Sequence, residues 1–206
     1  MTLCIKVTIL LMQLNTGSSG VAPMIPRPTP PTIVVGKPFH ARFVSTSRRN
    51  GEGKNAATTS HSGEMFRNSR GDMRIEWFSE SLVLLALIDK PGAFLHTASK
   101  AWMPLDGGPP RSHSVSTWAY ARSAPVYTDS YKTMYGLRCR LVTLRDPLSK
   151  RSAGEAWIAE DAGIVVSDTQ AEDGLTLEWK ITELTFNEPD PRLFEIPADY
   201  TETSEP

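Results

Sequence analysis

The sequence predicts a mainly β protein, with few or no helices, built as an antiparallel meander. Apolar and polar residues alternate with a period of two in several short segments, turn-forming residues separate these segments, and no clear amphipathic helix of ordinary length is present. We expect about eight strands, spaced as in a single sheet, a sandwich or a barrel. The 206 residues are 40% hydrophobic and 22% charged, which is enough for one globular domain with a sizeable core.

In the first half of the chain, turn signals separate the strand candidates. Arg49–Asn55 and Asn68–Asp72 hold the glycines and asparagines of hairpin loops, and Lys90–Ala93 predicts a type II turn with Pro second and Gly third. Leu82–Ile88 is a continuous apolar run that fits a buried strand or a short helix, and its short length and the turn after it favour a strand. The strands expected here cover residues 39–43, 58–67, 73–77, 82–88 and 94–98.

The second half repeats this pattern. Leu175–Thr182 has the cleanest alternation in the chain, with Trp179 among its apolar positions. Ser112–Ala124 is polar with embedded aromatic residues, and the sequence does not choose between a lid, a loop and one short helix. The further strands expected here cover residues 137–143, 155–159 and 164–169.

The first 32 residues differ from the rest. Lys6, the apolar stretch Val7–Met12 and the small residues Gly17–Ala22 follow the order of a secretory signal peptide over residues 1–22, and a disordered leader is the alternative. Residues 23–32 are a proline-rich linker, residues 33–201 a single β domain and residues 202–206 a tail. We therefore expect a periplasmic or secreted protein. No run approaches the ~20 apolar residues of a transmembrane helix.

Composition excludes several classes of function. The net charge of −1 provides no general attraction to nucleic acid or to an anionic membrane surface. Two cysteines, Cys4 and Cys139, cannot form a disulfide framework or a four-thiolate metal site. Cys139 lies on an alternating strand, where we expect a small buried apolar residue. Removal of residues 1–22 would leave it as the only thiol.

No pattern for catalysis, metal or cofactor binding stands out. The four histidines, His40, His61, His96 and His113, lack metal-ligand spacing, and neither Gly-x-Ser-x-Gly nor Ser-x-x-Lys occurs. The glycines within Gly51–Ala56 match a dinucleotide fingerprint only formally, because no helix follows them. An acid/base set of Glu64, Glu76 and Glu178 is conceivable, but cross-strand pairing with Arg67, Arg74 or Lys180 is preferred. We expect no enzyme, no metal and no cofactor.

Aromatic and aliphatic residues at alternating strand positions remain. In a closed barrel or a sandwich they are core, whereas in a half-open barrel the same face lines a cavity suited to acyl chains. The candidate cavity-lining residues are Phe43, Phe66, Ile75, Trp77, Leu141, Trp157, Leu177 and Trp179.

Four segments resemble those of uncharacterised exported bacterial proteins that are common in Acidobacteria. Asn187–Tyr200 resembles their closing "PDPxLFxIPxDY" stretch, and Gly63–Arg74 resembles their "GxxYRDSxGRxR" hairpin. Phe39–Phe43 resembles their opening strand, and Gly136–Cys139 resembles their "GVxC" strand start. The resemblance spans residues 33–201.

This group is similar in pattern to the LolA-like periplasmic half-barrels. The resemblance implies an incomplete, strongly curved antiparallel barrel around an apolar concavity, and known members carry or sense lipids or lipoproteins. This chain departs from the pattern because it lacks an obvious N-terminal helix and because Ser81–Ile88 is unusually apolar. The expected function is non-catalytic binding of a lipid or lipoprotein acyl chain at the cell envelope. The alternative is a structural or interaction protein with a self-filled β core.

The C-terminal block also has a direct physical interpretation. Prolines at positions 189, 191 and 197 keep the backbone extended and prevent a further ladder strand. Leu193, Phe194 and Ile196 are then apolar anchors. We expect them to hold the C-terminus over an open sheet edge or barrel end.

Overall fold

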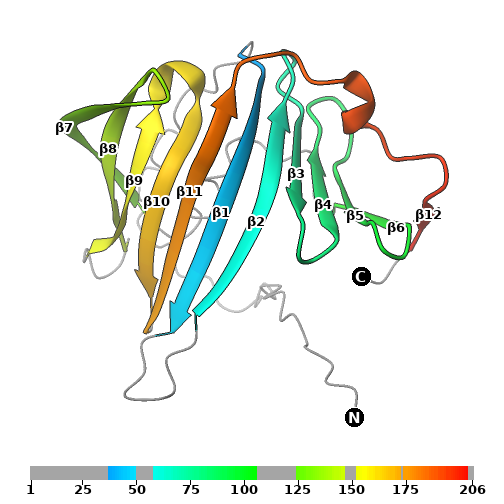
Figure 1. Cartoon of the computed structure of the whole chain (residues 1–206), viewed down its shortest axis with the longest axis horizontal. Helices are drawn as coiled ribbons and strands as arrows, with labels where there is room; N and C mark the ends of the chain where they lie inside the picture. Colours follow the sequence, from blue (N-terminus) through cyan, green and yellow to red (C-terminus); the bar gives the residue numbers. More distant parts are fainter. Residues whose placement is uncertain (1–36, 50–57, 106–123, 147–151, 173, 204–206) are drawn as a thin grey trace, which may run out of the picture.

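The computed structural model describes residues 37–49, 58–105, 124–146, 152–172 and 174–203, which form one twelve-stranded sheet (Figure 1). Two short 3-10 helices, η2 and η3, complete the secondary structure of these residues. The elements are β1 (Phe39–Arg49), β2 (Thr58–Arg67), β3 (Met73–Trp77), β4 (Leu82–Ala86), β5 (Ala93–His96), β6 (Ala101–Pro104), β7 (Ala124–Met134), β8 (Leu137–Arg145), β9 (Ser152–Ala159), η2 (Glu160–Ala162), β10 (Ile164–Glu172), β11 (Leu175–Thr185), η3 (Pro191–Phe194) and β12 (Thr201–Glu202).

The predicted mainly β class is confirmed, but the number of strands was set too low. Strands β6, β7 and β12 were not anticipated, because none of them shows a clean alternation. β6 has only four residues and ends at a proline, β7 is polar and carries a register shift, and β12 has two residues. The apolar run Leu82–Ile88 contains strand β4 and is followed by β5, as the strand interpretation required. The predicted type II turn at Lys90–Ala93 is wrong, because Gly92 lacks the positive φ that this turn needs.

The sheet consists of two meanders joined at the middle. Its strand order is β12-β6-β5-β4-β3-β2-β1-β11-β10-β9-β8-β7. β1 and β11 pair antiparallel from His40 opposite Thr185 to Arg49 opposite Leu175, so the first and last long strands of the chain lie side by side at the centre (Figure 1). β7 and the short β12 form the two edges, and the sheet is therefore not closed into a barrel.

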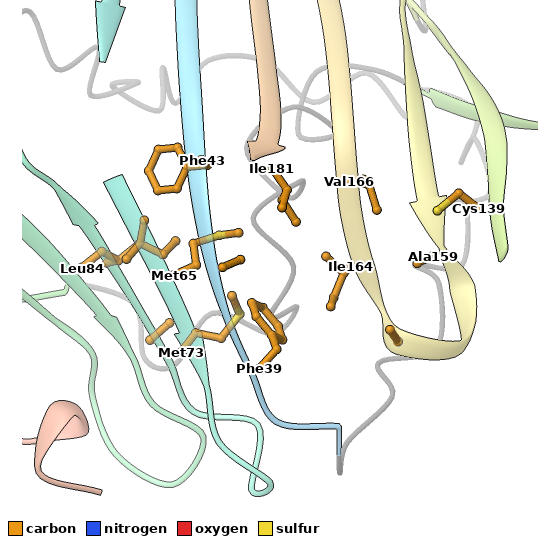
Figure 2. Packing of buried hydrophobic residues seen from close by; sticks show 14 residues of the cluster. Phe39, Phe43, Met65, Met73, Leu84, Cys139, Ala159, Ile164, Val166 and Ile181 are labelled. Atoms are coloured by element: carbon orange, nitrogen blue, oxygen red, sulfur yellow. The ribbon is translucent and has the colours of Figure 1, made fainter. Parts of the chain in front are cut away.

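One face of the curved sheet carries the largest apolar cluster. Phe39, Phe43 and Met65 from the β1–β2 side and Ile164 and Val166 from β10 belong to it, and Figure 2 shows them on the same side of the strands. Both meanders therefore contribute to one core, and we call this side the concave face. The fully buried members of the concave cluster are Phe39, Ala41, Phe43, Met65, Met73, Ile75, Leu84, Ala86, Cys139, Ala159, Ala162, Ile164, Val166 and Ile181.

The C-terminal residues 186–203, here called the C-terminal strap, cover the opposite face of β4 and β5. Phe194 is buried there against alternate residues of the apolar run, among them Val83 and Leu85. Arg74 Nη1 donates a 3.0 Å hydrogen bond to the carbonyl of Leu193, which ties η3 to β3. The predicted apolar anchors Leu193, Phe194 and Ile196 therefore pack mainly on this face of the sheet and not over its edge. The edge is protected by β12, which pairs parallel with β6.

Several predictions concern segments outside the described residues. These are the leader, the proline-rich linker, the glycine-rich hairpin loop, most of the polar segment 112–124 and His113. No helix among the described residues has the length and apolar character needed to cross a membrane.

Candidate functional site

Burial on the concave face falls steadily along the central strands. On β1, Phe39 and Phe43 are 1% and 2% exposed, whereas Ser47, further along the same face, is only partly buried. On the neighbouring β11, Ile181 is buried and Leu177 is 40% exposed. The concave face therefore has a closed end, where β1 begins and β2 ends, and a more exposed end that we call the mouth.

The closed end is held by the buried side chain of Arg67. Its Nε and Nη2 donate to the carbonyl of Lys37 at 3.0 and 2.8 Å, Nη2 also donates to the carbonyl of Ala162, and Nη1 donates to that of Gly163 at 3.3 Å. The guanidinium also lies 4.8 Å from the ring centre of Phe39. Burial lowers the pKa of Arg67 to about 10, so the group remains a cation at neutral pH.

This arrangement corrects one predicted ion pair. Arg67 was expected to be a cross-strand partner of one of the three glutamates, but it faces the concave side, while Glu64 lies on the opposite side of β2. Glu64 instead accepts a 3.0 Å hydrogen bond from Arg42 Nε on β1. Glu76 pairs with Arg74, but both residues lie on β3, so this pair is not a cross-strand one. The cross-strand interpretation holds for Glu64 alone of these two carboxylates, with a different arginine.

Toward the mouth, three aromatic rings meet across four strands. The ring of Phe43 lies 5.8 Å from that of Trp179 and 6.3 Å from that of Trp77, edge-on in the second case. Gly63 faces Phe43 in the register of β1 and β2. A Cβ at Gly63 would overlap the Glu76 carbonyl oxygen and lie 2.6 Å from Cζ of Phe43, so the ring fits only because Gly63 has no side chain.

The structure brings most of the predicted lining residues together. Phe43, Ile75, Trp77 and Trp179 all belong to or pack against the concave cluster, and Leu177 lies on the same face of β11 as Trp179. Of the remaining three, only Phe66 is placed on the other face, and Trp157 also packs against the concave cluster. Phe66 lies on the opposite face, stacked on His40 with ring centres 4.5 Å apart, and Leu141 and Trp157 face each other on β8 and β9. Trp157 packs at the border of the concave cluster, with Lys132 Nζ 3.9 Å from its ring centre.

A second apolar cluster adjoins the first across Trp179. It contains Val142, Ala156, Ile158 and Val165 from β8, β9 and β10. A register shift in β10 between Val165 and Ser167 lies beside this cluster and brings Asp168 opposite Ala156. Trp179 packs against both clusters.

Sequence reasoning missed one polar group at the mouth. Asp168 lies directly opposite Trp179 on β11 and Ala156 on β9, so these three side chains share a face. Gln170 Nε2 donates to Asp168 Oδ2 at 3.4 Å. Burial raises the pKa of Asp168 to about 6, and the hydrogen bond from Gln170 offsets part of that rise. The sequence did contain a signal for it. Asp168 is the acidic residue at the alternate position that follows the apolar residues Ile164 and Val166.

The other candidates for chemistry are dispersed. His61 Nδ1 lies 2.9 Å from Ser79 Oγ and 3.2 Å from Glu80, and His96 Nδ1 lies 2.8 Å from Ser99 Oγ. Over the described ranges, no three His, Cys, Asp or Glu side chains are grouped as metal ligands. Cys139 is a fully buried free thiol, as predicted, and burial raises its pKa.

Comparisons with known proteins place the fold but not a family. No protein-family model and no curated protein matches the chain. Among solved structures, an uncharacterized conserved protein from Thermus thermophilus aligns with TM-score 0.50 and 9% identity, over 79% of this chain and 90% of that one. At this identity the likeness concerns the fold alone.

Two further solved structures align with lower scores. A LolA superfamily protein from Nitrosomonas europaea aligns with TM-score 0.39 and 6% identity, over 77% of this chain and 90% of that one. A chain of the Pseudomonas aeruginosa MucA/MucB complex aligns with TM-score 0.42 and 13% identity, over 80% of this chain. The alignment covers 57% of the aligned chain of that complex.

Proposed function

We propose that this protein is a non-catalytic binding protein that holds an apolar chain, such as a lipid or lipoprotein acyl chain, against the concave face. The proposal rests on the gradient of burial along β1 and β11. A fully packed apolar interior at the closed end gives way at the mouth to Trp77, Trp179 and Leu177, which are apolar and only partly covered. A bound chain would complete this coverage.

Burial of apolar surface supplies the binding energy in this proposal. Each methylene removed from water contributes about 0.8 kcal/mol, so about ten methylenes contribute about 8 kcal/mol before the entropy of association is subtracted. Leu177, which is 40% exposed at the mouth, offers apolar surface for such contacts. No covalent step is needed.

The proposed compartment is the periplasm or the exterior of the cell. The pattern of residues 1–22 supports export, and the resemblance to exported half-barrel proteins supports both the compartment and the acyl class of ligand. Each of these supports is independent of the burial gradient, which concerns binding only.

Binding of the neutral apolar dye N-phenylnaphthylamine tests the proposal. We expect a saturable rise in dye fluorescence with the full chain. Leu177→Lys should weaken dye binding at least about tenfold, because it places a charge among the apolar side chains of the mouth. Thr182→Lys adds the same charge at an exposed position of the same strand and should leave dye binding unchanged. Absence of saturable binding, or equal binding by both variants, would contradict the proposal.

The second candidate function is an interaction protein whose sheet is filled by its own side chains. Full burial of Phe39, Phe43 and Met65 favours it, because these residues already occupy the closed end. Native mass spectrometry of protein purified gently from a cell-envelope extract separates the two candidates. An added mass that solvent extraction recovers as a lipid supports the binding protein. A bare mass that stays bare after incubation with lipid supports the interaction protein.

A further inference from the structure

One carboxylate stands among apolar side chains at the mouth. In the register of the sheet, Asp168 is flanked by Trp179 on one side and Ala156 on the other, and Val142 follows Ala156 on β8. The charged neighbours on these strands, Lys180 and Glu155, alternate onto the opposite face, where they pair with Ser167 and Thr169. Asp168 is thus the acidic side chain of β10 that lies on the concave face beside Trp179.

Asp168 is also poorly supplied with partners. An ionised carboxylate can accept about four hydrogen bonds. Among the described residues Asp168 accepts one, from Gln170 at 3.4 Å, and it forms no ion pair with a lysine, arginine or histidine of that part of the chain. A half-buried carboxylate with so few donors is costly to keep charged, and any donor that arrives with a ligand would reduce that cost.

Resting on the proposed function, we infer that Asp168 contacts the polar end of the bound chain. The mouth then selects amphiphiles whose polar end donates hydrogen bonds, an ammonium or a hydroxyl group, over amphiphiles that end in a carboxylate. The apolar tail lies along the aromatic rings of Trp179 and Phe43 toward the closed end. The polar end stays at the mouth, where Gln170 provides a second hydrogen-bonding side chain.

This arrangement explains why a carboxylate ligand is disfavoured. Two carboxylates at one site of reduced dielectric repel each other, and neither brings a donor for the other at neutral pH. The nearest fully buried cation on the concave face, Arg67, is occupied at the closed end by the carbonyls of Lys37, Ala162 and Gly163. It therefore does not offer a competing anion site at the mouth.

The test compares three amphiphiles of the same chain length: dodecylamine, dodecanol and laurate. Each displaces N-phenylnaphthylamine from the full chain at about pH 8, where all carboxylates concerned are ionised. The measurements are made on the wild-type chain, on Asp168→Asn and on the matched control Glu178→Gln. Glu178 lies opposite Thr169 on the adjoining strand and is exposed on the other face, so its substitution removes one negative charge without touching the mouth.

We expect the wild-type chain to bind dodecylamine at least about tenfold more tightly than laurate, with dodecanol in between. Asp168→Asn keeps the shape and an acceptor oxygen but loses the charge. It should reduce the amine-to-laurate preference to about threefold or less while the chain still unfolds cooperatively. Glu178→Gln should keep the wild-type preference.

Equal displacement by all three amphiphiles, or a preference that survives in Asp168→Asn, would overturn the inference. A preference for dodecylamine alone would identify a cation as the recognised group, and one shared with dodecanol would identify hydrogen-bond donation; both support the inference. Dye binding by itself distinguishes failure of the inference about Asp168 from failure of the proposed binding function. A chain that binds the dye but shows no preference retains the binding proposal, whereas a chain that binds no dye loses both.

Discussion

Arg67 on β2 donates hydrogen bonds to the carbonyls of Ala162 and Gly163, which lie 95 and 96 residues further along the chain. The same guanidinium donates to the carbonyl of Lys37 just before β1. One buried cation therefore joins the two meanders at the closed end. Backbone carbonyls, and not a carboxylate, satisfy its donors, so the site remains singly charged and needs a fixed backbone around it.

Replacement of Arg67 by Met should destabilise the protein. The variant removes the cost of burying a charge but leaves the carbonyls of Lys37, Ala162 and Gly163 without their donor. We expect the free energy of unfolding in urea to fall by about 2–4 kcal/mol. Arg42→Met removes an exposed arginine that pairs with Glu64 and should cost less than about 1 kcal/mol. Equal losses in the two variants would show that the carbonyl contacts of Arg67 contribute nothing.

Gly63→Ala should lower the stability of the protein, although it adds only one methyl group. The new Cβ would meet the Glu76 carbonyl oxygen and the ring of Phe43, and the backbone oxygen cannot move without breaking the β2–β3 ladder. We expect a loss of at least about 2 kcal/mol in urea unfolding. Ser62→Ala, on the exposed side of the next position, should change stability by less than about 0.5 kcal/mol. A tolerated Gly63→Ala would argue against the packing of Phe43 over this glycine.

Phe194→Ala should loosen the C-terminal strap. Loss of the buried ring should cost about 3–4 kcal/mol and leave a cavity against Val83, Leu85 and Leu95. Hydrogen exchange should then accelerate at the amides of Thr201 and Thr203, which donate to the carbonyls of Lys100 and Trp102 at 2.9 and 2.8 Å. Glu195→Ala, an exposed neighbour, serves as the control. Unchanged exchange in Phe194→Ala would mean that β12 is held to β6 independently of η3.

Asp168 should give the protein a specific dependence of stability on pH. Its pKa is about 6 in the folded protein and 3.8 ordinarily, so between these values the folded state binds more protons than the unfolded state. Stability contributed by protonated Asp168 is therefore present below about pH 4 and is lost as the pH rises through about 6. The groups beside it, Trp179, Ala156 and Gln170, do not titrate in this range.

Asp168→Asn reveals this dependence. At about pH 8 the variant should be about 1–2 kcal/mol more stable than the wild-type chain in urea unfolding, after allowance for the partial exposure of the group. At about pH 4 the difference in stability should vanish, because the carboxyl of folded wild-type protein is then protonated and uncharged, like the amide of the variant. Glu178→Gln should show no such crossover. A stability difference that is the same at both pH values would contradict the assignment of the raised pKa to Asp168.

The local pattern of the chain was enough to predict much of the sheet. Alternation in Leu175–Thr182 placed Leu177, Trp179 and Ile181 on one face, and the structure keeps them there. Turn signals at Asn68–Asp72 and Lys90–Ala93 separated strands that the structure shows as β2, β3, β4 and β5. Phe43, Ile75 and Trp77 were chosen as lining residues from the same periodicity. They share the concave face because each lies at an alternate position of a strand with a correctly predicted phase.

Phe66 shows where periodicity alone was insufficient. It is apolar and stands between Met65 and Arg67 in the sequence. The sequence could not indicate that the arginine, and not the phenylalanine, faces the concave side. The phase of β2 is set by its pairing with β1, which puts Met65 opposite Ala41 and Arg67 opposite Phe39. The phenylalanine is consequently on the opposite face, where it stacks on His40.

The sequence by itself determined the secondary-structure class, the approximate strand positions and the apolar anchors of the C-terminal strap, because these depend on residues within a few positions of one another. Tertiary structure alone decided that β1 pairs with β11, that Arg67 reaches Ala162 and Gly163, and that Asp168 stands beside Trp179. Each of these depends on strand register, and the position of Asp168 opposite Ala156 also depends on a register shift in β10. Register is settled by the free energy of packing both meanders onto one core, and that free energy belongs to contacts across the whole chain.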